Sequence, residues 1–194
     1  MDHSMTTLQP TQPILASRHN IIQGEFATSG DPGVMLTTLL GSCVAVCLYD
    51  LTVHVGGMNH FLLPETGNAD TANLSYGVNS MELLINDLLK QGASRIRMEA
   101  KVFGGARMIA GLSDIGERNS SFALKFLQME GIPVVSQCIG GTRARKLRFW
   151  PATGRVQHAF VALAPDAVKV PVAPPPPRAN HRRAQIISAD TALP

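Results

Sequence analysis

A cysteine directly after a Gly-Ser pair is the first residue whose type and position suggest catalysis. Cys43 follows Gly41 and Ser42 and begins an apolar segment, residues 43–50, that is typical of a strand. Gly41 permits a sharp bend, and the N–H groups of such a turn can converge on one point, as an oxyanion requires. A thiol in this place could be a nucleophile. The alternative is that it is a small buried apolar residue, which also explains Cys47 better.

A nucleophilic thiol needs a base, because a thiol with a pKa of about 8.5 is largely protonated at neutral pH. The next apolar segment, residues 53–63, carries His54 and His60. If this segment pairs antiparallel with the strand after Cys43, His60 comes closer to the thiol than His54 does. We therefore expect His60 to be the base, with a hydrogen-bonded core histidine as the alternative.

A third residue should hold the imidazole through its other nitrogen, as in catalytic triads. The preceding apolar segment, residues 34–40, supplies Thr37 and Thr38. Because side chains alternate along a strand, only one of the two can face the site. Residue spacing alone leaves the choice between them open.

A zinc site built from Cys43, Cys47 and His60 is the competing interpretation. On an extended strand the two thiols of this Cys-x-x-x-Cys pair would lie about 13 Å apart. Zinc–sulfur bonds are only about 2.3 Å long. The chain also lacks a G-x-x-x-x-G-K-[ST] phosphate-binding loop. We therefore expect neither a metal nor another cofactor.

Composition bounds the class of protein that must position these residues. The chain has 194 residues, of which 45% are hydrophobic and 16% charged, as in a globular domain. A formal net charge of +3 gives little reason to expect a nucleic-acid partner, which requires basic residues clustered on one face. No apolar run approaches the ~18 residues of a membrane span, and no export signal is evident at the N-terminus. We expect a cytoplasmic protein without membrane insertion.

Periodicity indicates the elements of the fold. Strand-like apolar segments occur at residues 21–28, 34–40, 43–50, 53–63, 95–103, 133–139, 145–150 and 156–164. Residues 79–92 and 117–130 instead repeat apolar residues at three- and four-residue steps, which is typical of amphipathic helices. This order favours an α+β fold, a layered sandwich of mixed or antiparallel β-sheets with two main helices on one face.

Both ends of the chain differ in composition from the middle. Residues 1–18 lack periodicity, and residues 165–194 are rich in alanine and proline, with four consecutive prolines. Such composition is typical of disordered or extended chain. We expect a disordered segment over residues 1–18, a catalytic domain over 19–164 and a Pro/Ala-rich tail over 165–194.

Five sequence blocks carry a family resemblance: LGSCVAVCLYD, GGMNHFLLP, FGGARM, DIGERN and GGTRARK. In the same order, over about residues 20–165, they resemble the CheD family, the chemoreceptor glutamine deamidases of bacterial chemotaxis. The resemblance implies a cysteine hydrolase with a Cys-His-Thr triad, on a sandwich shared with toxin-type cysteine deamidases. It implies that Cys43 is the nucleophile, His60 the base and Thr37 the orienting residue.

The reaction implied by the resemblance is hydrolysis of a glutamine side-chain amide to glutamate and ammonia through a cysteine thioester. Its substrates would be cytoplasmic helices of methyl-accepting chemoreceptors, and the phosphatase CheC is a second expected partner. The alternative is a weakly catalytic or non-catalytic module that binds receptor or CheC helices.

Further residues are expected around the reacting thiol. The turn at Gly41 and Ser42 should supply the oxyanion-stabilising amides. The expected rim that admits a helical substrate consists of Gly104, Gly105, Arg107, Asn119 and Arg143.

Overall fold

The structure is a computed structural model that describes residues 17–63, 70–108, 115–161 and 182–184. The strands are β1 (Ser17–Asn20), β2 (Glu25–Ser29), β3 (Val34–Leu40), β4 (Val44–Asp50), β5 (Val55–Phe61), β6 (Glu99–Gly104), β7 (Val134–Ile139), β8 (Arg145–Trp150), β9 (Arg155–Phe160) and β10 (Arg182–Arg183). The helices are α1 (Asp70–Lys90), α2 (Ile115–Met129) and the short 3-10 helix η1 (Pro151–Thr153).

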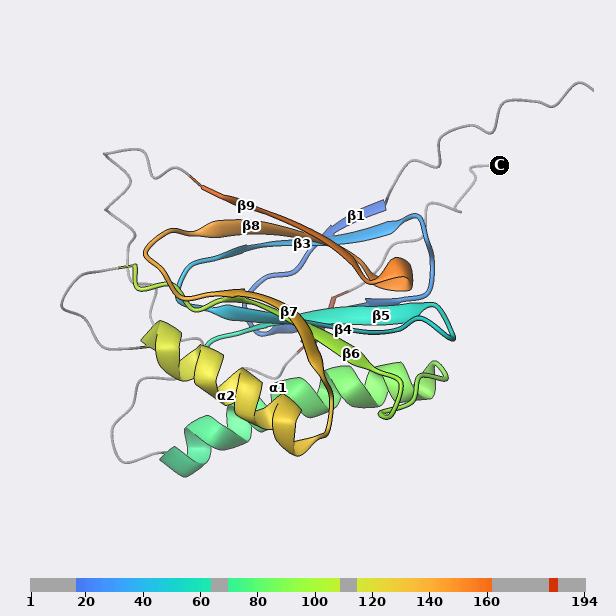
Figure 1. Cartoon of the computed structure of the whole chain (residues 1–194), viewed down its shortest axis with the longest axis horizontal. Coiled ribbons are helices and arrows are strands. Elements are labelled where there is room, and N and C mark those ends of the chain that lie inside the picture. Colours follow the sequence, from blue (N-terminus) through green and yellow to red (C-terminus); the bar gives the residue numbers. More distant parts are fainter. Residues whose placement is uncertain (1–16, 64–69, 109–114, 162–181, 185–194) are drawn as a thin grey trace, which may run out of the picture.

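These elements form three layers (Figure 1). A four-stranded sheet in the order β1-β3-β8-β9 lies over a six-stranded sheet in the order β10-β2-β5-β4-β6-β7. Helices α1 and α2 cover the other face of the six-stranded sheet (Figure 1). Both sheets are mixed, since β1 pairs in parallel with β3 and β6 in parallel with β7. The predicted α+β sandwich with two helices on one face is confirmed.

The β4–β5 hairpin lies at the centre of the six-stranded sheet. Every residue of β4 and β5 is buried, because helices cover one face and the second sheet covers the other. Val44, Val46 and Leu48 of β4 join the core on the helix side, whereas Ala45 and Cys47 join the core between the sheets. This hairpin therefore fixes which side chains of the Cys43 segment face the space between the sheets.

The helices follow from their apolar spacing. In α1, Met81, Leu84, Ile85 and Leu88 are fully buried at steps of three and four residues. The helix begins at Asp70, earlier than the predicted residue 79, and it continues through Gly77, where a Cβ would collide with Phe122 and Leu63. Within the described residues, no helix is both long and apolar enough to cross a membrane.

Some predicted strands are shorter than the apolar segments that indicated them. The segment predicted at residues 21–28 becomes β2 only at Glu25, since Gly24 adopts a φ of +86° and turns the chain. The segment predicted at residues 95–103 becomes β6 only at Glu99. Residues 21–24 instead form a loop, which lies against the candidate site described below.

The predicted domain limits can be followed only where the chain is described. Residues 1–16 and most of the predicted tail lie outside the described residues. Ser17 and Arg18, within the predicted disordered segment, belong to β1. Residues 182–183, within the predicted tail, pair in parallel with β2 as the outermost strand of the six-stranded sheet. Strand β10 was not anticipated from the sequence.

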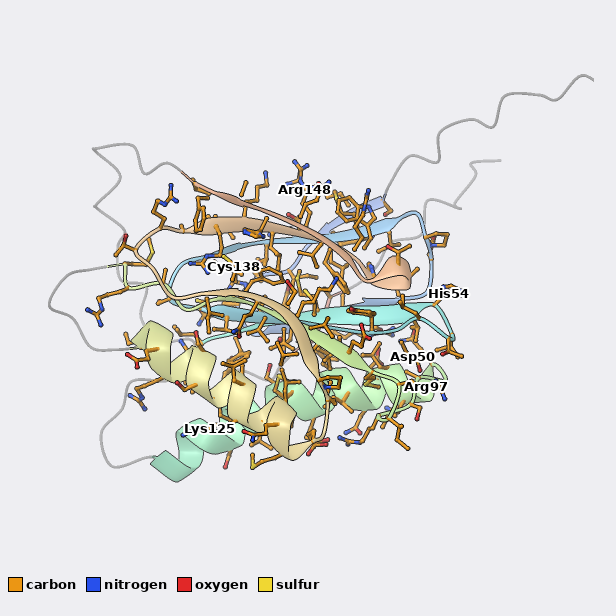
Figure 2. All side chains as sticks on the ribbon, in the orientation of Figure 1. Asp50, His54, Arg97, Lys125, Cys138 and Arg148 are labelled. Carbon is orange, nitrogen blue, oxygen red and sulfur yellow. The ribbon has the colours of Figure 1, made fainter. Side chains whose placement is uncertain are left out.

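A buried carboxylate holds the end of the β4–β5 hairpin. Asp50 is fully buried, accepts hydrogen bonds from the backbone N–H groups of Thr52 and Ser94, and pairs with Arg97 at 2.8 Å. Figure 2 shows Asp50 and Arg97 together at this end of the molecule. Burial alone would raise the pKa of Asp50, but these hydrogen bonds and the Arg97 charge together lower it. Asp50 thereby helps to fix the hairpin whose register positions His60.

We predict that Asp50→Asn lowers the free energy of unfolding by about 1–3 kcal/mol at neutral pH, the usual cost of losing charge-assisted hydrogen bonds to a buried group. Because the pKa of Asp50 is lower in the folded state, its contribution is present above the unfolded-state pKa of about 3.9 and is lost as the pH falls through the folded value. Urea unfolding as a function of pH measures this. An equal pH dependence in wild type and Asp50→Asn would contradict it.

Candidate active site

Cys43 lies in the tight turn that connects β3 to β4. Its side chain is half-buried and packs against the apolar residues between the two sheets. Burial raises the pKa of the Cys43 thiol to about 11. The resting side chain is therefore a neutral thiol that needs a base before it can attack a carbonyl carbon.

The turn that holds Cys43 is fixed through three consecutive carbonyl groups. The carbonyl of Gly41 accepts from Ala106 N–H at 2.8 Å, and that of Cys43 accepts from Gly105 N–H at 2.8 Å. The carbonyl of Ser42 accepts from the side-chain amide of Asn119 on α2 at 2.9 Å. In a trans peptide the N–H group points opposite to the carbonyl. The N–H groups of Ser42 and Cys43 are therefore directed away from these partners, which is compatible with the expected oxyanion site.

His60 lies on β5, next to the strand that follows Cys43. It pairs with Ala45, and Cys43 precedes Ala45 by two residues on the same side of the chain. This places Cys43 diagonally across from His60, a relationship that corresponds to about 7–8 Å between backbones and is within reach of long side chains. His54, the other histidine considered, lies in the β4–β5 turn with a φ of +53° and is not near this position.

The contacts of His60 define which ring nitrogen carries the proton. Nδ1 lies 2.9 Å from Thr38 Oγ1 and 3.3 Å from the carbonyl oxygen of Ile21. The Thr38 hydroxyl itself donates to the same Ile21 carbonyl at 2.7 Å. Since both neighbours of Nδ1 therefore offer acceptors, Nδ1 is the donor, and Nε2 carries the lone pair. A neutral imidazole with a free Nε2 lone pair is the form that a general base requires.

Burial also affects the pKa of His60. Only 6% of His60 is exposed, and desolvation lowers its pKa, against the opposing effect of the Ile21 hydrogen bond. The imidazole is therefore neutral at neutral pH. Nε2 is buried and has no hydrogen-bond partner among the described residues. The Cys43 thiol instead donates to the side-chain oxygen of Gln23 at 3.5 Å. The thiol and the imidazole are not hydrogen-bonded to each other.

The structure places Thr38, rather than Thr37, against the imidazole. The Thr37 hydroxyl donates to the carbonyl of Leu147 on β8 at 2.8 Å. Thr37 is paired with Arg148, whose side chain projects from the outer face of the four-stranded sheet (Figure 2). Thr38 shares the opposite face of β3 with Leu36, which lies in the core between the sheets. The expectation that Thr37 orients His60, implied by the family resemblance, therefore does not match this geometry.

The structure divides the expected rim residues into two pairs and a fifth residue, Arg143, that lies apart from both. Gly105 and Arg107 line a cavity of about 490 Å³, which Ser42 of the turn that holds Cys43 also lines. Gly104 and Asn119 brace the turn itself, and a Cβ on Gly104 would lie 2.1 Å from the Cys43 carbonyl oxygen. Arg143 stacks on the ring of Phe160 at 4.1 Å, outside the cavity lining. Gly105 and Arg107 thus shape the cavity beside Cys43, and Gly104 and Asn119 fix the turn that holds the thiol.

A buried arginine that the sequence analysis did not single out supports the cavity wall. Arg145 is 1% exposed and donates to the carbonyl groups of Gly104, Cys138 and Gly140. Its guanidinium therefore joins the end of β6 to the end of β7 and the residue that follows it. Figure 2 places Cys138 within the layers rather than on the outer surface. The signal in the sequence was an arginine at an inward-facing position of an alternating strand, together with Leu147.

Cys43, Cys47 and His60 were considered above as zinc ligands. Among the described residues, no group of three or more His, Cys, Asp or Glu side chains is arranged to hold a metal ion. Cys47 is fully buried among apolar side chains between the sheets. Its position matches the apolar role considered for it.

The chain is similar to proteins of known family. The family model described as CheD, chemotactic sensory transduction, matches residues 62–159, a range that begins just after His60. A Caulobacter vibrioides protein named probable chemoreceptor glutamine deamidase CheD is 50% identical over 177 residues, covering 89% of this chain and 95% of that protein. An Agrobacterium fabrum protein of the same name is 53% identical over 171 residues, covering 85% and 94% respectively.

Two solved structures are also similar in outline. The Bacillus licheniformis hypothetical protein YfiH aligns with a TM-score of 0.40 and 11% identity, covering 68% of this chain and 61% of that one. The Neisseria meningitidis protein NMB0706 aligns with a TM-score of 0.34 and 13% identity, covering 60% and 51%. At these low scores neither likeness bears on the chemistry of the site.

We predict that alkylation of Cys43 by iodoacetamide rises about tenfold per pH unit from about pH 7 to pH 10, because the reacting thiolate is scarce below the thiol pKa. The rate should level off only near the pKa of about 11. Peptide mass spectrometry after timed labelling measures the rate, with the fully buried Cys47 as an internal reference that stays unlabelled. A plateau below about pH 8 would instead indicate a preformed thiolate.

Proposed function

Since the chain belongs to the CheD family, we propose that it hydrolyses the side-chain amides of glutamines in methyl-accepting chemoreceptors, giving glutamate and ammonia. One observation carries the chemical part of this proposal. His60 holds a proton on Nδ1 and a lone pair on Nε2, on the strand beside β4, which begins directly after Cys43. A thiol and a neutral base in this relation are what hydrolysis through a thioester requires.

In the first half of the reaction, His60 Nε2 takes the proton from Cys43, and the sulfur attacks the carboxamide carbon of the substrate glutamine. The N–H groups of Ser42 and Cys43 stabilise the oxyanion of the tetrahedral intermediate. The protonated imidazole then gives its proton to the leaving nitrogen. Ammonia departs, and the glutamyl group remains bonded to sulfur as a thioester.

In the second half, Nε2 takes a proton from water as the water oxygen attacks the thioester carbonyl carbon. The carbon–sulfur bond breaks, the sulfur recovers its proton from the imidazolium, and the glutamate side chain is released. The net change is one amide and one water converted to one carboxylic acid and one ammonia. His60 acts as a base twice, and Thr38 and Ile21 hold its ring in place through Nδ1.

The thiol pKa of about 11 favours proton transfer that accompanies attack. A thiolate would be scarce at neutral pH before substrate binds, so the base must act while the carboxamide is in place. The neutral state of His60 suits this role, because burial lowers its pKa and keeps Nε2 unprotonated.

The cavity beside Ser42 supports a helical substrate. Its lining includes the apolar side chains of Met108, Ile115, Leu124 and Ile139 together with the guanidinium of Arg107. An apolar groove with a few polar groups is the kind of surface that receives one face of an amphipathic helix. We propose that a receptor helix lies along it and presents a glutamine to Cys43, in the cytoplasm. The phosphatase CheC is a proposed second partner that would bind at the same approach.

The function is tested by co-expressing the protein with a chemoreceptor and measuring receptor peptides by mass spectrometry. Conversion of glutamine to glutamate adds about 1 Da and one negative charge. The wild type should produce this shift, and Cys43→Ala and His60→Ala should each abolish it, because the two groups act as one unit. Cys47→Ala is the matched control, since it removes a buried thiol from the same strand and should leave the shift in place.

The binding-module alternative makes a different prediction for the same variants. If the protein acts only by gripping receptor or CheC helices, Cys43→Ala should be silent in a chemotaxis assay and the receptor mass should not change with any variant. Deamidation that persists in Cys43→Ala would remove Cys43 from the mechanism.

We predict that Thr38→Val lowers the rate of deamidation by about tenfold or more, because the imidazole loses one of the two acceptors that hold its orientation. Thr37→Val is a closely matched control, since Thr37 is equally buried and its hydroxyl also donates to a backbone carbonyl. It should retain most of the activity. Nitrogen NMR of His60 distinguishes a change at the ring from a general loss of stability, because only Thr38→Val should shift the Nδ1 signal. Loss of activity confined to Thr37→Val would assign the orienting role to Thr37.

A further inference from the structure

The loop at residues 21–24 is tied to the same groups that hold the base. The N–H group of Ile21 donates to the carbonyl of Thr37 at 2.8 Å, and the Ile21 carbonyl accepts from Thr38 at 2.7 Å. At the other end of the loop, Gly24 N–H donates to the carbonyl of His60 at 2.7 Å. Both ends of the loop are therefore fixed beside the imidazole.

Between these two anchors the side chain of Gln23 contacts the nucleophile. Ile21 is fully buried, whereas Ile22 and Gln23 are exposed. The side-chain carbonyl oxygen of Gln23 accepts a hydrogen bond from the Cys43 thiol at 3.5 Å. A Cβ on Gly24 would lie 3.5 Å from the Tyr76 hydroxyl of α1, so the loop runs between that helix and the turn that holds Cys43. A primary carboxamide, the group on which the proposed reaction acts, thus already lies at the reactive sulfur.

We propose that Gln23 occupies a carboxamide-binding subsite at Cys43 in the free protein, and that a substrate glutamine must displace it. The identity of the competing group rests on the proposed function. Two observations support the subsite together. The Cys43 thiol donates to Gln23, and His60 Nε2, which is buried, has no partner among the described residues. Release of Gln23 frees the thiol to turn toward Nε2.

The geometry also explains why Gln23 can stay in place without being hydrolysed. In the observed contact the sulfur donates its hydrogen to the carbonyl oxygen. Attack requires a deprotonated sulfur that approaches the carbonyl carbon, with its proton already on the base. Gln23 therefore holds the thiol in its protonated form, away from His60.

The test measures how fast iodoacetamide, a small primary carboxamide, alkylates Cys43 at a fixed neutral pH in the full-length protein. Gln23→Ala removes the whole side chain, and Gln23→Met keeps the length but removes the carboxamide. Both variants should react about two- to tenfold faster than wild type, the range that loss of one hydrogen bond of ordinary net strength implies. Ile22→Ala is the control, because Ile22 is the exposed neighbour in the same loop and should leave the rate unchanged.

Equal alkylation rates in wild type, Gln23→Ala and Gln23→Met would overturn the proposal. So would a mass about 1 Da higher in the wild-type peptide that carries residue 23, since Gln23 would then be a substrate and not a lasting occupant. The labelling assay does not depend on receptor turnover. If Cys43 labels faster in both Gln23 variants but no receptor is deamidated, the subsite stands and the proposed function fails. If the Gln23 variants label at the wild-type rate and the protein deamidates receptors, the proposed function stands and the subsite proposal fails.

Discussion

The candidate site depends on the hydrogen bonding of His60 Nδ1 to Thr38 and Ile21. A buried imidazole can present either nitrogen as a base, and the choice is made by what the other nitrogen contacts. Here a hydroxyl and a backbone carbonyl, from Thr38 and Ile21, both require a donor at Nδ1. The two acceptors come from different strands and loops. The correct tautomer therefore exists only when β1, β3 and β5 are assembled across both sheets.

The turn that holds Cys43 is organised by hydrogen bonds to its backbone carbonyl groups. Three successive carbonyls, from Gly41 to Cys43, are bound by the segment after β6 and by α2. Gly104 approaches the Cys43 carbonyl so closely, with a φ of +114°, that no side chain fits there. The glycine at the end of β6 is thus required by packing against the turn. The buried guanidinium of Arg145 also donates a hydrogen bond to the carbonyl of Gly104.

The β4–β5 hairpin and the place of His60 relative to Cys43 could be predicted because they depend on local pairing. Antiparallel β4 and β5 are joined by a short turn, so their register follows from the chain itself and places His60 near Cys43. The choice between Thr37 and Thr38 depends on which face of β3 meets the second sheet. Apolar residues flank both threonines, so alternation was ambiguous. The contact of Gln23 with Cys43 could not be predicted from strand alternation either. It depends on the left-handed turn at Gly24, which directs the loop at residues 21–24.

Strand β10 links the far end of the chain to the segment that carries Gln23. Arg183 pairs with Asp87 of α1, and its neighbour Ala184 donates to the carbonyl of Phe26. An exposed edge strand has unpaired backbone N–H and C=O groups that can pair with a strand of another chain, and covering the edge limits such pairing. In the described chain β10 occupies that edge of β2, one residue beyond the loop at the thiol. Detachment of residues 182–184 would expose a strand edge directly next to the loop that carries Gln23.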